Sequence, residues 1–111
     1  MNDRDKKFLD SLVISNIIPV FDRINDDAMD RFLYVYSGIV TKGTKNIVIA
    51  ISSGGGSVDV CFEMFDLIKH FPGQTTGLVF GKAMSAAAIV LQACNTRFAT
   101  ANARVLIHHG K

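Results

Sequence analysis

A run of apolar residues at 46–52, NIVIAIS, constrains the fold more than any other stretch of the chain. Continuous runs rich in Ile and Val are typical of strands buried on both faces, which occur in parallel sheets covered by helices. A glycine-rich turn at 53–57, SGGGS, follows this strand, and a helical pattern at 58–71 follows the turn. Its expected buried face carries Val58, Cys61, Phe62, Phe65 and Ile68. This order predicts an α/β fold with right-handed crossovers.

The rest of the chain continues the alternation of strands and helices. Residues 1–10 are charged and read as an N-terminal arm, either a short helix or a mobile segment, before a single α/β domain at 11–111. Within that domain the patterns predict one strand or two short ones at 12–21, then a helix capped by Asn25 or Asp26 that ends near Gly43. A buried strand at 75–80, a buried helix at 83–94, and short strands at 96–99 and 103–108 are expected to follow.

Composition excludes several classes of protein. The 111 residues are 49% hydrophobic with a net charge of +2, which argues against a disordered chain and against nucleic-acid binding. No apolar stretch is long enough to cross a bilayer, and the N-terminus is not a clean secretory signal, so we expect a cytoplasmic protein without a membrane partner. Cys61 and Cys94 are then expected to be reduced core thiols, and no spacing of Cys and His suggests a metal site.

Three features could carry chemistry, and each also has an ordinary structural explanation. The triplet at 54–56 exposes backbone N–H groups beside a helix N-terminus, which suits an anion or oxyanion, but the tripeptide taken alone is more typical of a tight turn. Ser85 lies among small residues at the first turn of an apolar helix. It could act as a nucleophile there, or it could simply cap the helix. His108 lies at the end of a predicted strand. It could act as a general base, or it could be an ordinary structural histidine.

Together these segments resemble the proteolytic subunit of the ATP-dependent Clp protease. VFDRINDDAMDRFL resembles that family's first strand, its Gly-x-Ile turn and the next helix, with Asp22 in place of Gly. AISSGGGSVDV is similar to the Ser-Pro-Gly-Gly-Ser-Val loop, with Gly54 in place of Pro. The family segment that carries the nucleophilic serine is similar to GLVFGKAMSAAAIVLQAC. The family segment that carries the catalytic histidine is similar to RFATANARVLIHH, where Ala101 replaces Pro.

The resemblance implies a ClpP/crotonase-like α/β fold of repeated strand–helix units, with a mostly parallel buried sheet, and a serine endopeptidase that cuts unfolded polypeptides. It makes Ser85 the nucleophile and His108 the general base, with an oxyanion hole from the backbone N–H groups of Gly56 and Ala86. An extended peptide substrate would bind along Ser57 and Val58. The family implies a homo-oligomeric ring, no cofactor, and ATP used only by a separate AAA+ unfoldase.

The chain also departs from the family pattern. The family's third triad residue is an aspartate well downstream of the histidine, and the sequence stops at Lys111, so we expect either a fragment without the C-terminal part of the fold or a short paralogue. Two alternatives follow: a non-catalytic or remnant subunit without the triad Asp, and a crotonase-type acyl-CoA enzyme. Lys82, which follows Gly81, suggests one further alternative, in which a lysine rather than a histidine pairs with Ser85 as a Ser–Lys catalytic dyad.

Overall fold

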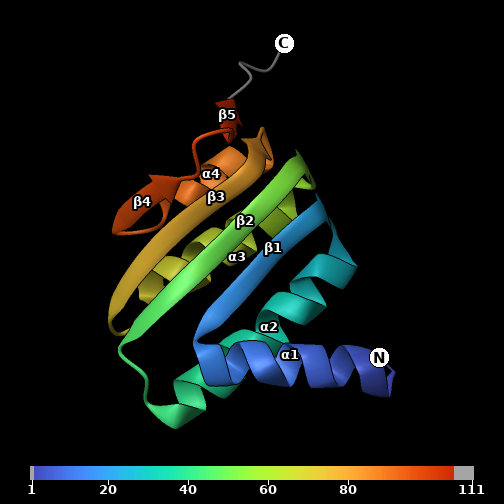
Figure 1. Cartoon of the computed structure of the whole chain (residues 1–111), viewed down its shortest axis with the longest axis vertical. Coiled ribbons are helices and arrows are strands. Elements are labelled where there is room, and N and C mark those ends of the chain that lie inside the picture. The colour runs from blue at the N-terminus through green and yellow to red at the C-terminus, as the bar shows by residue number, and fades with distance from the viewer. Residues whose placement is uncertain (1, 107–111) are drawn as a thin grey trace.

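The sheet of the molecule is entirely parallel in the computed structural model, which describes residues 2–106. Its strands lie in the order β1-β2-β3-β4, and β5 pairs with β3 beyond the end of β4 (Figure 1). The bounds are β1 Ile17–Ile24, β2 Asn46–Gly56, β3 Gln74–Met84, β4 Thr96–Ala99 and β5 Arg104–Leu106. The predicted α/β fold with a mostly parallel sheet is therefore confirmed.

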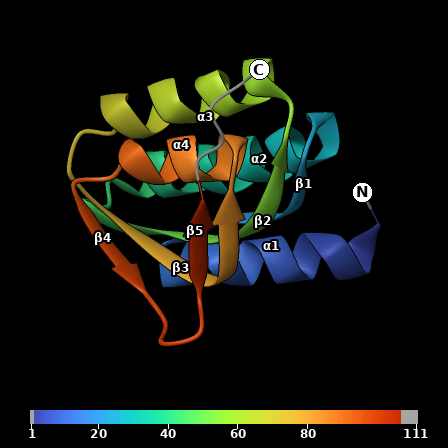
Figure 2. The ribbon, with the colours of Figure 1, turned by 90° about the horizontal axis from the view of Figure 1, so that it is seen from above.

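Three helices pack on one side of this sheet (Figure 2). They are α2 (Asp26–Lys42), α3 (Val58–His70) and α4 (Ala86–Gln92), while α1 (Asp3–Ser15) lies near the beginning of β1 (Figure 1). The predicted caps of α2 are confirmed, because the Asn25 side chain accepts from the Ala28 N–H at 2.9 Å and Gly43 closes the helix with φ 75°. No helix among residues 2–106 is long and apolar enough to span a membrane.

Strand β2 supplies the centre of the core. Ile47, Ile49 and Ile51 are at most 2% exposed. On the opposite face Val48 and Ser52 are half-buried, since α2, α3 and α4 all cover the other side. Ala50 on this face is 7% exposed, so the expected burial of the strand on both faces holds at Ala50 but only partly at Val48 and Ser52.

The predicted strand at 12–21 is wrong in its first part, because α1 continues without interruption to Ser15. Its apolar residues pack against α2: Leu9 is 1% exposed, and Val13 lies so close to Gly38 that a Cβ added to that glycine would sit 2.9 Å from a Val13 methyl. The Tyr34 hydroxyl also donates to Asp10 at 2.7 Å. These tertiary contacts outweigh the β preference of Val13 and Ile14.

Three other boundaries differ from prediction. Residues 53–56 do not form a separate turn but extend β2, and β3 likewise runs on to Met84, so that α4 begins only at Ala86.

Helix α3 buries Val60, Cys61, Met64 and Ile68. Val58 and Phe62 are 56% and 48% exposed, so the predicted inward face of α3 was partly wrong.

Candidate active site around Ser85

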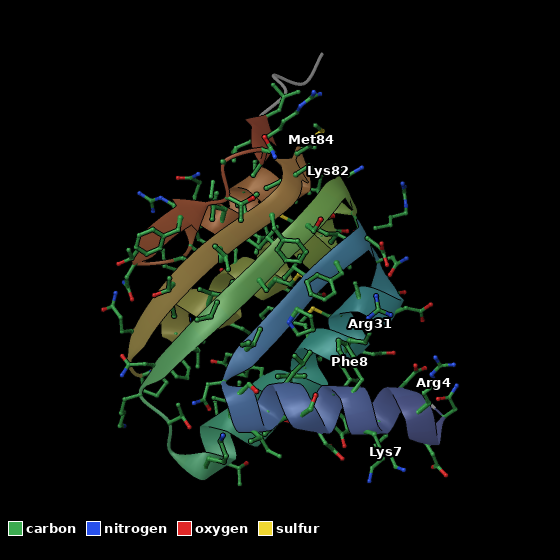
Figure 3. The ribbon with its side chains drawn as sticks, viewed as in Figure 1. Arg4, Lys7, Phe8, Arg31, Lys82 and Met84 are labelled. Carbon is green, nitrogen blue, oxygen red and sulfur yellow. The ribbon has the colours of Figure 1, made fainter. Side chains whose placement is uncertain are left out.

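The candidate site lies where parallel strands reach their carboxyl ends, the usual position of ligand sites in open α/β sheets. The glycine-rich end of β2, the end of β3 and the short strand β5 all lie at this edge (Figures 1 and 3). Met84 pairs in register with Leu106, and Ser53 pairs with Ala83. Segments that are far apart in the sequence therefore meet around Ser85.

Ser85 lies at the sharp turn between β3 and α4. Its backbone has φ 51° and ψ −121°, a strained conformation for a residue with a side chain. Its hydroxyl does not cap α4, so the ordinary explanation of this serine as a helix cap does not hold. A strained strand-to-helix turn that presents a half-buried serine is the geometry of a nucleophile elbow.

The glycines of β2 permit close approach to this turn. A Cβ on Gly55, where φ is 106°, would lie 3.0 Å from the Ser85 Cβ and 2.9 Å from the Met84 carbonyl oxygen. A Cβ on Gly56 would collide with the Ile24 carbonyl oxygen of β1. Neither position has room for a side chain, so both glycines are required by packing as well as by backbone conformation.

Strand β5 is tied directly to the serine. The Ser85 N–H donates to the Leu106 carbonyl oxygen at 2.8 Å. His108, the predicted base, lies outside the described residues, as does its neighbour His109. Leu106 could not be identified from the sequence, because strand register cannot be read from an apolar pattern.

A second contact that the sequence does not reveal joins α3 to the start of α4. The Cys61 Sγ lies 3.2 Å from the Ala86 carbonyl oxygen and is fully buried. Burial raises the pKa of the Cys61 thiol, which keeps its proton available for this hydrogen bond. Burial also raises the pKa of the Cys94 thiol, to about 11, although nearby Arg97 and Lys69 lower it slightly. Both cysteines are free and buried, as predicted.

The remaining predicted residues occupy the edge of the site. Ala86 is the first residue of α4 and is buried, while Gly56 is the last residue of β2. Ser57 caps α3 by accepting from the Val60 N–H at 3.2 Å, and Val58 is exposed beside it. Among residues 2–106 no three His, Cys, Asp or Glu side chains group closely enough to hold a metal ion.

The fold and the Ser85 turn define an α/β protein with a strained strand-to-helix turn at the carboxyl edge of a parallel sheet. Residues 2–111 match the family model described as Clp protease, and the chain belongs to this family. It is 37% identical over 107 residues to the ATP-dependent Clp protease proteolytic subunit 1 of Chlamydia trachomatis, covering 94% of this chain and 54% of that protein. It is 32% identical to the ATP-dependent Clp protease proteolytic subunit of Cyanophora paradoxa, covering 96% of this chain and 59% of that protein.

Solved structures show the same fold. The ClpP protease catalytic domain from Plasmodium falciparum superposes with a TM-score of 0.85 at 23% identity, over 99% of this chain and 63% of that one. A ClpP1 mutant from Listeria monocytogenes gives 0.84 at 22% identity, over 93% and 61% of the two chains. The chain thus spans between half and two thirds of the length of these relatives.

Proposed function

We propose that this chain is part of a serine endopeptidase of the Clp proteolytic-subunit type, with Ser85 as its nucleophile. The observation that carries the proposal is the strained turn at Ser85, with φ 51° and a side chain that does not cap the helix it precedes. Such strain persists only where the surrounding structure enforces it, and it is concentrated at functional sites. The names of the relatives, proteolytic subunits of ATP-dependent Clp proteases, support a peptidase.

In the proposed reaction, His108 takes the proton of the Ser85 hydroxyl as the oxygen attacks the carbonyl carbon of a peptide bond. The negative charge that develops on the carbonyl oxygen is stabilised by the backbone N–H groups of Gly56 and Ala86. His108 then gives its proton to the leaving amine, and water releases the acyl group from Ser85. The hydrogen bond from the Ser85 N–H to Leu106, two residues before His108, supports the pairing of base and nucleophile.

The proposed substrate is an extended, unfolded polypeptide. Ser57 and Val58 follow the glycine-rich end of β2, and the exposed side chain of Val58 offers apolar contact to such a peptide. The homo-oligomeric ring, the AAA+ unfoldase that would use ATP, the lack of a cofactor and the cytoplasmic location stay predictions that rest on the family resemblance.

Hydrolysis of a quenched fluorescent peptide by three forms of the chain tests the proposal. Ser85→Ala is expected to lower kcat by a factor on the order of 10⁴ or more, because it removes the attacking oxygen. Ser37→Ala is the matched control, since Ser37 is an exposed serine of α2 whose hydroxyl bonds only within its own helix. Equal hydrolysis by the parent and Ser85→Ala would reject the nucleophile.

A further inference from the structure

A pocket of about 310 Å³ opens beside the Ser85 turn and is not used by the proposed chemistry. Asp22, Arg23, Gly54, Gly55 and Lys82 line it. Gly55 connects this pocket to the nucleophile, because a Cβ on that residue would lie 3.0 Å from the Ser85 Cβ. The pocket and the Ser85 turn therefore share the glycine-rich end of β2.

The absence of a side chain at position 54 leaves room for Lys82. A Cβ on Gly54 would lie 3.7 Å from the Lys82 Cε and 3.8 Å from its Nζ. These are ordinary van der Waals distances, so a residue with a longer side chain at position 54 would compete with the lysine for this space. The Lys82 side chain is exposed and lines the pocket at the upper end of the sheet (Figure 3).

The charges around this pocket favour an anion. Arg23 and Lys82 line it, and Arg104 of β5 is the register partner of Lys82, so the two side chains leave the sheet on the same face. Asp22 is the opposing negative charge in the lining. The lining itself holds two cations, Arg23 and Lys82, against one carboxylate, so its net charge is positive.

We propose that this pocket binds a carboxylate of the peptide substrate, and that Lys82 sets a preference for acidic residues near the bond to be cleaved. The inference rests on the proposed function, because it assigns a specificity to the same site. The carboxylate comes either from an Asp or Glu side chain or from the free C-terminus of a short peptide.

Paired peptides distinguish these sources. In peptides capped at both ends, Glu replaces Gln at each position in turn, and the Gln peptide is also made with a free C-terminus. Both kcat/KM and the Kd of a labelled peptide are measured on the parent chain. An exposed ion pair predicts that Glu is favoured over Gln at one position by about two- to fivefold, and that added salt weakens the preference. A preference only for the free C-terminus would assign the pocket to the chain end.

Three variants test whether the pocket is responsible. Lys82→Gln should bring the Glu-to-Gln ratio close to one. Asp22→Asn should raise the ratio, because Asn tolerates the φ of 62° at this position while removing the opposing charge. Lys45→Gln, which removes an exposed lysine just before the beginning of β2 at the opposite end of the sheet, should leave the ratio unchanged.

The outcomes separate this inference from the proposed function. Equal rates and equal Kd values for carboxylate and amide peptides, or a preference that survives Lys82→Gln, would overturn the carboxylate pocket. Tighter binding of a carboxylate peptide without any hydrolysis that depends on Ser85 would instead overturn the peptidase and leave the pocket supported.

Discussion

The backbone N–H of Ser85 donates to the carbonyl oxygen of Leu106 at 2.8 Å. This hydrogen bond joins the turn that presents the proposed nucleophile to the last described residue of β5, at 21 positions' separation in the sequence. The register of Met84 with Leu106 holds the same two segments side by side. The geometry of Ser85 is therefore set by β5 as well as by the turn between β3 and α4.

Gly55→Ala is expected to lower the stability of the protein more than an alanine substitution at an uncrowded glycine, because it also crowds the Ser85 turn. An Ala here adopts an unfavourable backbone conformation, at about 1–2 kcal/mol, and its Cβ crowds Met84 and Ser85, at about 1–3 kcal/mol more. Urea unfolding followed by circular dichroism measures the loss of stability. Peptide hydrolysis should fall further than the unfolded fraction explains.

Gly43→Ala is the matched control for this substitution. Gly43 also has a positive φ, 75°, but nothing lies within 4 Å of its added Cβ. It should lose only the backbone contribution, about 1–2 kcal/mol, and keep its hydrolysis per folded molecule. Equal losses of stability and activity in the two variants would contradict the close approach of Gly55 to Ser85.

Asn95→Ala is expected to destabilise the connection between α4 and β4. The Asn95 side-chain oxygen accepts from both the N–H and the hydroxyl of Thr75, at 2.9 and 3.1 Å. Thr75 is 2% exposed, so its N–H would lose a partner where water cannot easily replace it. A loss of about 1–3 kcal/mol in the free energy of unfolding follows. Asn46→Ala, at an exposed asparagine that begins β2, should change it little; equal effects would argue against the Thr75 contacts.

The buried thiol of Cys94 predicts a loss of stability at alkaline pH. Its pKa is raised by burial from 9.0 to about 11, so the folded state keeps a proton that the unfolded state releases. The free energy of unfolding is then unaffected by this group below about pH 9 and falls as pH rises toward about 11. Urea unfolding at several pH values should show a shallower decline in Cys94→Ala than in the parent. Identical slopes would show that the thiol does not contribute.

The central part of the fold could be predicted from the sequence because local and tertiary signals agree there. The run at 46–52 is both β-branched and buried, and Asn25 and Gly43 supply the caps that α2 needs. At 12–15 the signals conflict: Val13 and Ile14 favour a strand, yet packing of α1 on α2 keeps them helical. On α3 a three- and four-residue spacing fits more than one face, and Met64 rather than Phe62 is buried.

The candidate site could be predicted only in outline. Ser85 and the glycines 54–56 were recognisable as residue types that suit nucleophilic chemistry and an oxyanion hole. Their closeness could not be read from the sequence, because it depends on strand register and on the φ values of Gly55 and Ser85. No sequence pattern indicates that the Leu106 carbonyl oxygen accepts from the Ser85 N–H, or that the Cys61 thiol contacts the Ala86 carbonyl oxygen.

Covalent labelling with a fluorophosphonate tests the central claim most directly, because this reagent reacts with serines activated by a neighbouring base. Intact mass spectrometry of the natively isolated protein, followed by peptide mapping, should find one adduct per chain at Ser85. The adduct should be absent from Ser85→Ala, form much more slowly in His108→Ala, and persist in Ser37→Ala. A folded parent protein that gains no adduct, or gains it on another residue, would contradict the assignment of Ser85 as the nucleophile.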